Sequence, residues 1–461
     1  MTFEFPLRRR EATLGLTAAL LGGRHAWAQP GRSPWFDDAG RPTALAREAL
    51  ALLTAAADDG LDPQDYGVAA LGPALAASSA PNAESSARLG AALTAALQRL
   101  LSDLALGRVD PRAIHHRFSV APRAGFDAAA TLQAALARGR LAEAVAVARP
   151  PLPLYGQLMQ ALARYRALAG HPAWSRTLPA LPLPRGARAG KLEPGQPWAG
   201  VATLAARLAA LGDLAPGGAA PAVYDAALVE AVRGFQGRHG LTVDGVLGRA
   251  TVAALEVAPA LRAHQIALMM ERLRWTPLMQ GPRMVVVNIP EFQLRAYEVV
   301  DGRITVRAQM RVIVGQALDK QTPLFDERMR FIEFSPYWNV PPSIARAETV
   351  PRLRRDPGYW AREGFEFVGA GGAADPVLSG AKLDAVLAGA LRIRQRPGPA
   401  NALGDIKFVF PNRDHIFLHH TPSTGLFARE RRDFSHGCIR VEDPVALARF
   451  VMAGMPGWDE A

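Results

Sequence analysis

Segment 431–444 reads "RRDFSHGCIRVEDP" and contains Cys438, the only cysteine in a chain of 461 residues. A lone cysteine is either an inert apolar side chain or a reactive thiol. Only the thiolate is a strong nucleophile, and with an ordinary pKa near 8.5 only about 3% of a thiol is ionised at pH 7. A catalytic Cys438 therefore needs a neighbouring base and a group that orients that base.

Histidines upstream of Cys438 are the candidate bases. His436 lies two residues before the thiol, and the pair His419-His420 ends the apolar segment "IFL", which we expect to be a strand. No histidine follows Cys438. This order disfavours papain-like cysteine peptidases, in which the histidine follows the nucleophile.

The residues beside Cys438 suit acyl transfer. Gly437 permits a sharp turn, which would leave backbone N–H groups free to face a developing oxyanion. Arg440 is two residues beyond the thiol, so on an extended strand it shares a side with Cys438 and could meet a substrate carboxylate. Each of these features is weak by itself, and the argument rests on their combination.

A zinc site is the alternative chemistry for this region. His415 and His419 would share a strand face, and with His436 and Cys438 they could ligate zinc. No compact H-x-x-x-H helix and no cysteine pair supports that interpretation, so we predict neither a metal nor another cofactor. His415 and His420 are expected to be structural or surface residues.

The rest of the C-terminal region reads as a mainly β domain. Segment 284–315 is β-branched with turn signals at Pro290 and Asp301-Gly302, and further strands are expected at 329–334, 406–410 and 415–419. A more helical segment rich in Arg and Gly, about 344–395, interrupts these strands. The sequence therefore predicts a β domain with a helical insertion near its site.

The N-terminal half is helical. Residues 33–169 are rich in Ala and Leu at helical spacing and predict a scaffold of several helices. Segment 177–197, "TLPALPLPRGARAGKLEPGQP", is typical of a linker. Segment 201–255 predicts a three-helix unit whose pattern F-Q-x-x-x-G-L-x-x-D-G-x-x-G-x-x-T, from Phe235 to Thr251, resembles the peptidoglycan-binding domain found beside cell-wall enzymes.

Charge and the first residues indicate export and an anionic partner. The formal net charge is +11 and the arginines are scattered, which favours a polyanionic surface over sequence-specific nucleic acid. Arg8–Arg10, an apolar run and Ala26-Trp27-Ala28 predict a signal peptide over residues 1–28, of the general or the twin-arginine type. No later apolar run is expected to span a membrane, so we predict a periplasmic protein.

The motif H-x(15)-S-H-G-C-x-R, from His419 to Arg440, resembles the signature of L,D-transpeptidases with a YkuD-type catalytic domain. The segments "RVIVGQALDKQTPLF", "FSPYWNVPPSIA" and "RPGPANALGDIKFVFPN" resemble the large, multi-domain periplasmic branch of that family. The resemblance implies the following roles: Cys438 as nucleophile, His419 as general base and acid, His436 as secondary candidate, Gly437 as oxyanion-hole backbone, and Arg440, Ser435, Trp338 and Asn339 as substrate-binding residues. Relatives often have Asp or Ser at the position of His420, so the group that orients His419 stays open.

The same resemblance implies a reaction and a domain plan. The reaction would be 3→3 cross-linking of peptidoglycan stem peptides through a cysteine thioester, with L,D-carboxypeptidase activity or a non-catalytic wall-binding role as alternatives, and with transient contacts to wall synthases. The fold class expected is multi-domain α+β. Its parts would be the signal peptide (1–28), the helical scaffold with its linker (29–190), the peptidoglycan-binding domain (191–258) and the catalytic domain (259–461), whose insertion at 344–395 would be a substrate-capping lid.

Overall fold

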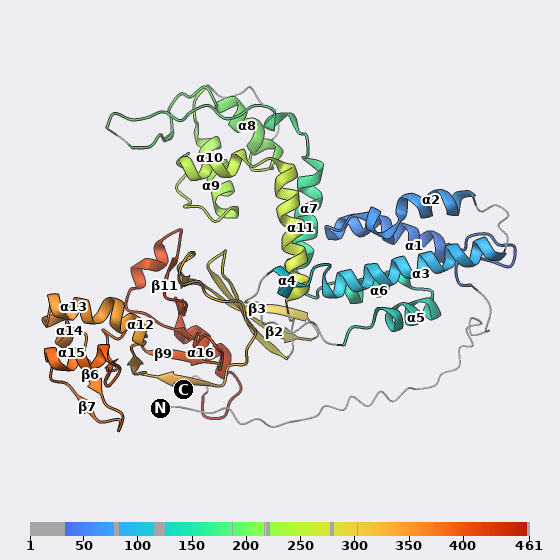
Figure 1. Ribbon diagram of the computed structural model, residues 1–461. Coiled ribbons are helices and arrows are strands. Elements are labelled where there is room, and N and C mark those ends of the chain that lie inside the picture. The colour runs from blue at the N-terminus through green and yellow to red at the C-terminus, as the bar shows by residue number, and fades with distance from the viewer. Residues whose placement is uncertain are drawn as a thin grey trace. The chain divides into compact units, whose positions relative to one another are not determined.

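The computed structural model describes residues 33–77, 83–114, 125–186, 188–215, 217, 222–276, 281–301 and 303–458. The predicted signal peptide lies outside these residues. The chain divides into a helical unit that ends at Leu278 and a mainly β unit that begins at Met279 (Figure 1). The multi-domain α+β class predicted from the sequence is confirmed.

The helical unit contains eleven α-helices within the described residues. They are α1 (Ala44–Thr54), α2 (Val68–Ala77), α3 (Ala83–Leu106), α4 (Pro111–Ile114), α5 (Ala128–Arg138), α6 (Leu141–Ala148), α7 (Pro153–Ala167), α8 (Val201–Ala210), α9 (Ala226–Arg238), α10 (Arg249–Glu256) and α11 (Pro259–Trp275). Side-chain oxygens of Thr43, Asp127 and Asp225 accept backbone N–H groups at the starts of α1, α5 and α9. Such caps satisfy donors that have no partner within the helix.

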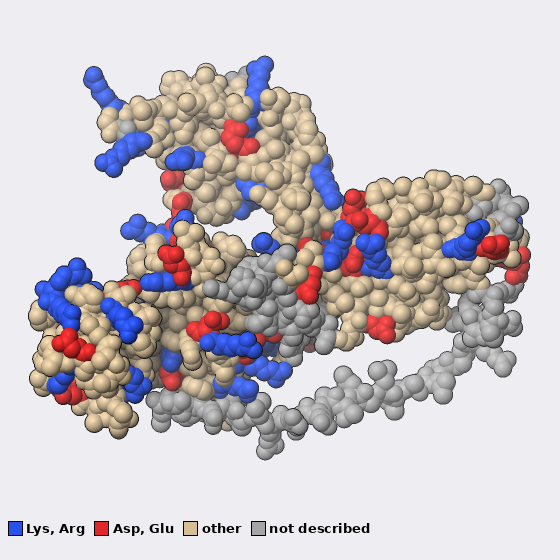
Figure 2. Space-filling model, viewed as in Figure 1, with Lys and Arg blue, Asp and Glu red and all other residues tan. Residues whose placement is uncertain are grey.

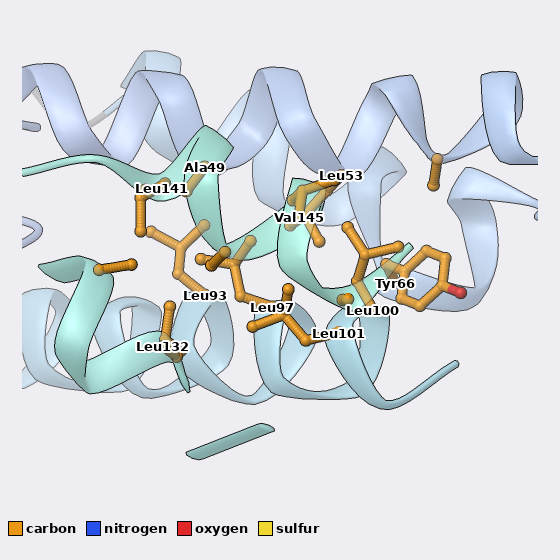
Figure 3. Packing of buried hydrophobic residues seen from close by; sticks show 14 of the residues in the cluster. Ala49, Leu53, Tyr66, Leu93, Leu97, Leu100, Leu101, Leu132, Leu141 and Val145 are labelled. Atoms are coloured by element: carbon orange, nitrogen blue, oxygen red, sulfur yellow. The ribbon is translucent and has the colours of Figure 1, made fainter. Parts of the chain in front are cut away.

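Helix α3 supplies much of the first core. Leu93, Leu97, Leu100, Leu101 and Leu104 recur at helical spacing and are at most 1% exposed. They meet residues of α1, α5 and α6 (Figure 3). By length and composition α3 could also cross a membrane, a feature that our sequence reasoning overlooked. Because these leucines are buried against other helices, their apolar character is explained by the core.

A second core belongs to α8, α9 and α10, the predicted three-helix unit. The Gln236 side chain closes the turn that follows α9: its Nε2 donates to Asp244 Oδ1 and Val246 O, each at 3.0 Å, and its Oε1 accepts the Gly245 N–H at 2.9 Å. Gln236 is buried, so these bonds satisfy a polar group that would otherwise be costly. The F-Q…D-G pattern thus has a structural reason.

The segment predicted as a linker is partly incorporated in this second core. Leu178 and Leu192 are buried with the residues of α8 and α9, and Leu192 exchanges backbone hydrogen bonds with Leu247. Apolar burial and bridge pairing therefore override the Pro- and Gly-rich composition of this segment.

Helix α11 also differs from its expected place. The sequence-based division assigned it to the catalytic domain, from residue 259, but it packs along α7 in the helical unit. The buried Arg274 guanidinium donates to the Tyr155 hydroxyl at 2.8 Å and to Glu271 at 2.7 Å. A buried cation needs such partners, and α7 provides one of them.

The β unit is built on one eight-stranded sheet and one four-stranded sheet. The larger sheet has the order β1-β2-β3-β12-β10-β9-β4, with β11 beside β3. Its strands are β1 (Arg283–Asn288), β2 (Gln293–Val300), β3 (Arg303–Gly315), β4 (Phe331–Phe334), β9 (Ile406–Val409), β10 (Leu418–His419), β11 (Asp433–Ser435) and β12 (Ile439–Val441). One face packs a core that includes Phe408, Leu418 and Ile439, to which α16 (Pro444–Met452) contributes Leu447. The expected strand 415–419 is shorter than predicted, because His415 has a positive φ of 55°.

The insertion is less helical than the sequence suggested. It contains α12 (Pro342–Ile344), a π-helical turn (Ala345–Thr349), α13 (Val350–Arg355), α14 (Gly358–Arg362) and α15 (Gly380–Leu387). It also contains β6 (Phe365–Val368), β7 (Ala374–Asp375) and β8 (Arg392–Gln395), which form the smaller sheet with β5 (Trp338–Asn339). Phe365, Phe367 and Ile393 are buried in a core of the insertion's own. On the face shown in Figure 2, Lys and Arg side chains are dispersed among acidic ones over the insertion and the helical unit, as the scattered arginines predict.

Candidate active site

Cys438 lies in a tight turn between β11 and β12. The Ser435 hydroxyl donates to the Cys438 carbonyl at 2.5 Å and accepts the Gly437 N–H at 3.2 Å. Gly437 has a φ of +123°, and a Cβ there would lie 3.0 Å from Ile416 Cδ1, so glycine suits this position. The Ser435 hydroxyl at the start of the turn therefore closes the turn through these two hydrogen bonds.

These contacts describe two of the residues expected from the sequence. Ser435 is only 2% exposed, and its hydroxyl makes its hydrogen bonds within the turn. The Gly437 N–H donates to the Ser435 hydroxyl. The Cys438 N–H has no acceptor in the described part of the chain, and it is the remaining donor for an oxyanion.

Thr322 is a functional residue that sequence reasoning missed. Its hydroxyl donates to the Gly437 carbonyl at 2.7 Å and accepts the Gly315 N–H at 2.9 Å. Thr322 is buried and lies more than 100 positions before the turn. Its place within "DKQTPLF" offered only a Thr-Pro step, which is a general loop signal.

We expect Thr322→Val to destabilise the β unit by about 1–3 kcal/mol, because it leaves a buried N–H and a buried carbonyl unpaired at nearly constant volume. Chemical denaturation measures the change, and Thr322→Ser, which keeps the hydroxyl, is the matched control. Equal stability of the two variants would contradict the role assigned to the hydroxyl.

The Cys438 side chain lies in a largely apolar setting. Burial raises the pKa of the thiol, although a backbone contact with Phe417 and the charges of Lys407 and Arg440 oppose this. Sγ is 3.9 Å from the His415 carbonyl oxygen. In the resting site the sulfur is therefore a neutral thiol, and an adjacent base has to accept its proton for it to react.

His419 is placed as a neutral base. Its Nδ1 lies 2.5 Å from the His420 carbonyl oxygen, and this backbone contact orients the ring, a point that the sequence left open. Burial first, and then the charge of Arg440, lower the pKa of His419 to about 3. The proton on Nδ1 is assigned from this hydrogen bond, and it leaves Nε2 as the basic nitrogen.

No hydrogen bond joins the His419 ring to Sγ within residues 403–441, which the structure describes without a gap. The two residues come from neighbouring parallel strands, since Leu418 pairs with Ile439 and His419 with Arg440. Catalytic hydrogen bonds are often long before substrate binds, so this geometry is compatible with a base at His419.

A row of polar side chains, two of them cationic, crosses the sheet at the level of His419. Lys407 on β9, His419 on β10 and Arg440 on β12 are direct register partners, so their side chains project to one face, opposite the core. Lys407 pairs with Glu333 at 2.9 Å and lies over the Phe417 ring at 4.6 Å. Sequence reasoning singled out Arg440 but not Lys407, although the alternation in "IKFV" could have placed Lys407 on the open face of its strand.

Arg440 has no anionic partner among the described residues. Its Nε is buried without an acceptor, and burial lowers its pKa. A buried N–H without an acceptor is costly even on a partly exposed guanidinium, and a bound carboxylate would relieve that cost through paired hydrogen bonds. This observation fits the substrate-binding role expected for Arg440.

The other expected residues lie away from the thiol. His436 Nε2 is 2.6 Å from Glu348 on the insertion and makes no contact with Sγ. Trp338 and Asn339 pair with Gln395 and Arg394 in the sheet of the insertion, and nothing joins them to Cys438 in the described chain. Among the described residues, no group of three or more His, Cys, Asp or Glu is arranged to hold a metal ion.

A cysteine in the turn before β12 and a histidine on β10, the parallel neighbour of β12, are compatible with cysteine-dependent chemistry. Comparison with known proteins specifies it: residues 282–457 match the family model "L,D-transpeptidase catalytic domain", residues 199–255 match "Putative peptidoglycan binding domain" and residues 27–162 match "Scaffold domain". Residues 282–457 are thus an L,D-transpeptidase catalytic domain of the YkuD type, accompanied by two further domains, and the resemblance of the motif around Cys438 to this domain is confirmed.

A curated relative and a solved structure are partly similar to this chain. A Haemophilus influenzae protein named "Putative L,D-transpeptidase" is 32% identical over 199 residues, which are 43% of this chain and 38% of the relative. The match thus spans well under half of that protein's length. The solved L,D-transpeptidase of Xylanimonas cellulosilytica is 19% identical, with coverage of 62% of this chain and 94% of that one; its TM-score is 0.16, which carries no argument about the fold.

Proposed function

We propose that this protein is a peptidoglycan L,D-transpeptidase that forms 3→3 cross-links through a Cys438 thioester. The observation that carries the proposal is the matched catalytic domain, in which Cys438 directly precedes the strand that pairs with the strand of His419 and the His420 carbonyl holds the His419 ring. A neutral His419 can accept a proton from the thiol, whereas a ring that was already protonated could not.

In the acylation step, the thiol proton moves to His419 Nε2 while Sγ attacks the carbonyl carbon of the third residue of a donor stem peptide. The negative charge on the carbonyl oxygen is stabilised by the Cys438 N–H. His419 then returns the proton to the departing amine of the terminal D-Ala, and a thioester remains. The unpaired Arg440 supports recognition of a donor carboxylate.

The second step decides the product. The amine of another stem peptide attacks the thioester, its extra proton passes to His419, and Cys438 is released as a thiol. Water in place of the amine gives L,D-carboxypeptidase activity. The insertion at 344–395 is proposed to cap the donor peptide, and wall synthases are proposed as transient partners.

The peptidoglycan-binding match at residues 199–255 supports the wall as partner, and a formal charge of +11 suits an anionic polymer. We propose that the protein acts in the periplasm after export through residues 1–28. A wall-binding protein without catalysis is the alternative, but the oriented His419 and the unpaired Arg440 would have no purpose in it.

Incubation of the purified protein with a disaccharide-tetrapeptide is expected to yield a cross-linked dimer with release of D-Ala. Mass spectrometry of the products distinguishes the outcomes. A tripeptide alone would assign the carboxypeptidase reaction, and unchanged tetrapeptide together with binding to isolated sacculi would refute catalysis in favour of the binding protein.

A further inference from the structure

A carboxylate, an ammonium group and an imidazole from distant segments meet beside the Cys438 turn. Glu348 lies on the π-helical turn of the insertion, and its Oε1 contacts His436 Nε2 at 2.6 Å and Lys320 Nζ at 3.1 Å. His436 belongs to the turn itself, and Lys320 belongs to the segment between β3 and β4. Glu348 is therefore the point at which the insertion is attached to the active-site turn.

The segment that carries Lys320 also holds the turn directly. The Gln316 N–H donates to the Ser435 carbonyl at 3.1 Å, and the Thr322 hydroxyl donates to the Gly437 carbonyl at 2.7 Å. Segment 316–322 thus contacts the turn at both ends and the insertion at Lys320. A movement of the insertion that pulls on Glu348 would act on the residues on either side of Gly437.

The contact of Glu348 with His436 and Lys320 is suited to an insertion that can detach from the turn and bind to it again. Burial opposes ionisation of Glu348, but hydrogen bonds from His436 and Lys320 outweigh it and hold its pKa below the ordinary value. The three side chains are 31–48% exposed, so solvent screens the contact and its strength is modest. Single π-helical turns occur frequently at functional sites, where they offer an alternative local packing.

We propose that Glu348 is a positioning residue that couples the seating of the insertion to the geometry of the Cys438 turn. When the insertion is seated, Glu348 fixes His436, and the turn that follows it presents the thiol in one conformation. When the insertion lifts, this restraint is lost and only Ser435 and segment 316–322 hold the turn. The effect on turnover rests on the proposed function, whereas the coupling itself does not.

The test compares Glu348→Ala and Glu348→Gln in the full-length protein, with Asp384→Asn as matched control. Asp384 is also an acidic residue of the insertion, paired with Arg354 within the insertion and not with the turn. Hydrogen exchange of amides 436–439 and the rate of Cys438 alkylation by iodoacetamide are measured first, followed by kcat and KM on the disaccharide-tetrapeptide.

We expect Glu348→Ala to raise exchange at amides 436–439 and to raise KM about two- to fivefold with a smaller change in kcat, the range of an exposed ion pair. Glu348→Gln keeps an acceptor for His436 and should restore most of the exchange protection. Adding His436→Ala to Glu348→Ala should cause little further change.

Unchanged exchange in Glu348→Ala, or the same increase in Asp384→Asn, would overturn the coupling. Exchange and alkylation need no wall substrate, so they decide on the coupling even if no cross-link forms. Failure of the proposed function would instead appear as unchanged tetrapeptide in the parent protein.

Discussion

Cys438→Ala is expected to abolish both cross-linking and acylation by a carbapenem, because we propose that both reactions acylate the Cys438 sulfur. The chain has no second thiol, and Cys438 is the only side chain in the turn that can form a thioester. Mass spectrometry of the intact protein after incubation with the drug should show an adduct in the parent and none in the variant.

The same variant tests whether binding and chemistry are separate. Binding to isolated sacculi is assigned to residues 191–258, which belong to the helical unit, whereas Cys438 belongs to the β unit. Co-sedimentation with sacculi should therefore be unchanged. If the variant lost both binding and cross-linking while its circular dichroism spectrum stayed like that of the parent, the assignment of the two activities to separate units would be wrong.

The sequence predicted the parts of the site that are local in the chain. A turn at Gly437 that leads into a strand, and His419 at the end of another strand, follow from short-range patterns of glycine, histidine and β-branched residues. The carbonyl that holds the His419 ring was left open by the sequence and is seen only in the structure. The turn's own hydrogen bonds were not predictable in the same way, because Ser435 could have faced either the substrate or the backbone. Only coordinates show that its hydroxyl lies 2.5 Å from the Cys438 carbonyl oxygen.

The contributions from distant segments could not be predicted at all. Thr322 and Glu348 contact the turn from 115 and 88 positions away, respectively. Their own neighbourhoods in the sequence carry no signal for those contacts. The position of Lys407 could be predicted in part. Strand alternation places it on the open face of the sheet but does not identify His419 as its neighbour.

Tertiary packing also explains where the structure differs from the domain limits expected from the sequence. Leu178 and Leu192 are scattered through a stretch with the composition of a linker, and two apolar residues are too few for a periodic signal. Helix α11 shows no clear amphipathic pattern, but it packs along α7, and its Arg274 donates to Tyr155 of that helix. Specific pairings of this kind depend on tertiary structure.

His419→Ala is expected to lower the rate of acylation by roughly 10²–10⁴-fold, the usual cost of losing a general base. His436→Ser should cost far less, because His436 bonds to Glu348 and not to the thiol. Stopped-flow measurement of carbapenem acylation gives both rates at one pH. Near-normal acylation by His419→Ala together with an inactive His436→Ser would reverse the two roles.

The pH dependence of the acylation rate distinguishes a neutral thiol and imidazole at Cys438 and His419 from a thiolate–imidazolium ion pair. Burial lowers the pKa of His419 to about 3 and raises that of Cys438, so between pH 5 and 8 the ring stays unprotonated and the sulfur stays a thiol. The acylation rate of the parent should therefore be flat over this interval, with no inflection near 6.5, the ordinary pKa of histidine. A thiolate–imidazolium pair would behave differently: the rate would fall as the pH dropped through the thiol pKa and as it rose through that of the imidazole. The contradicting result would be an inflection near pH 6.5 in the parent and in His436→Ser that disappears in His419→Gln. It would show that His419 titrates in this range and is not the buried, neutral imidazole described above.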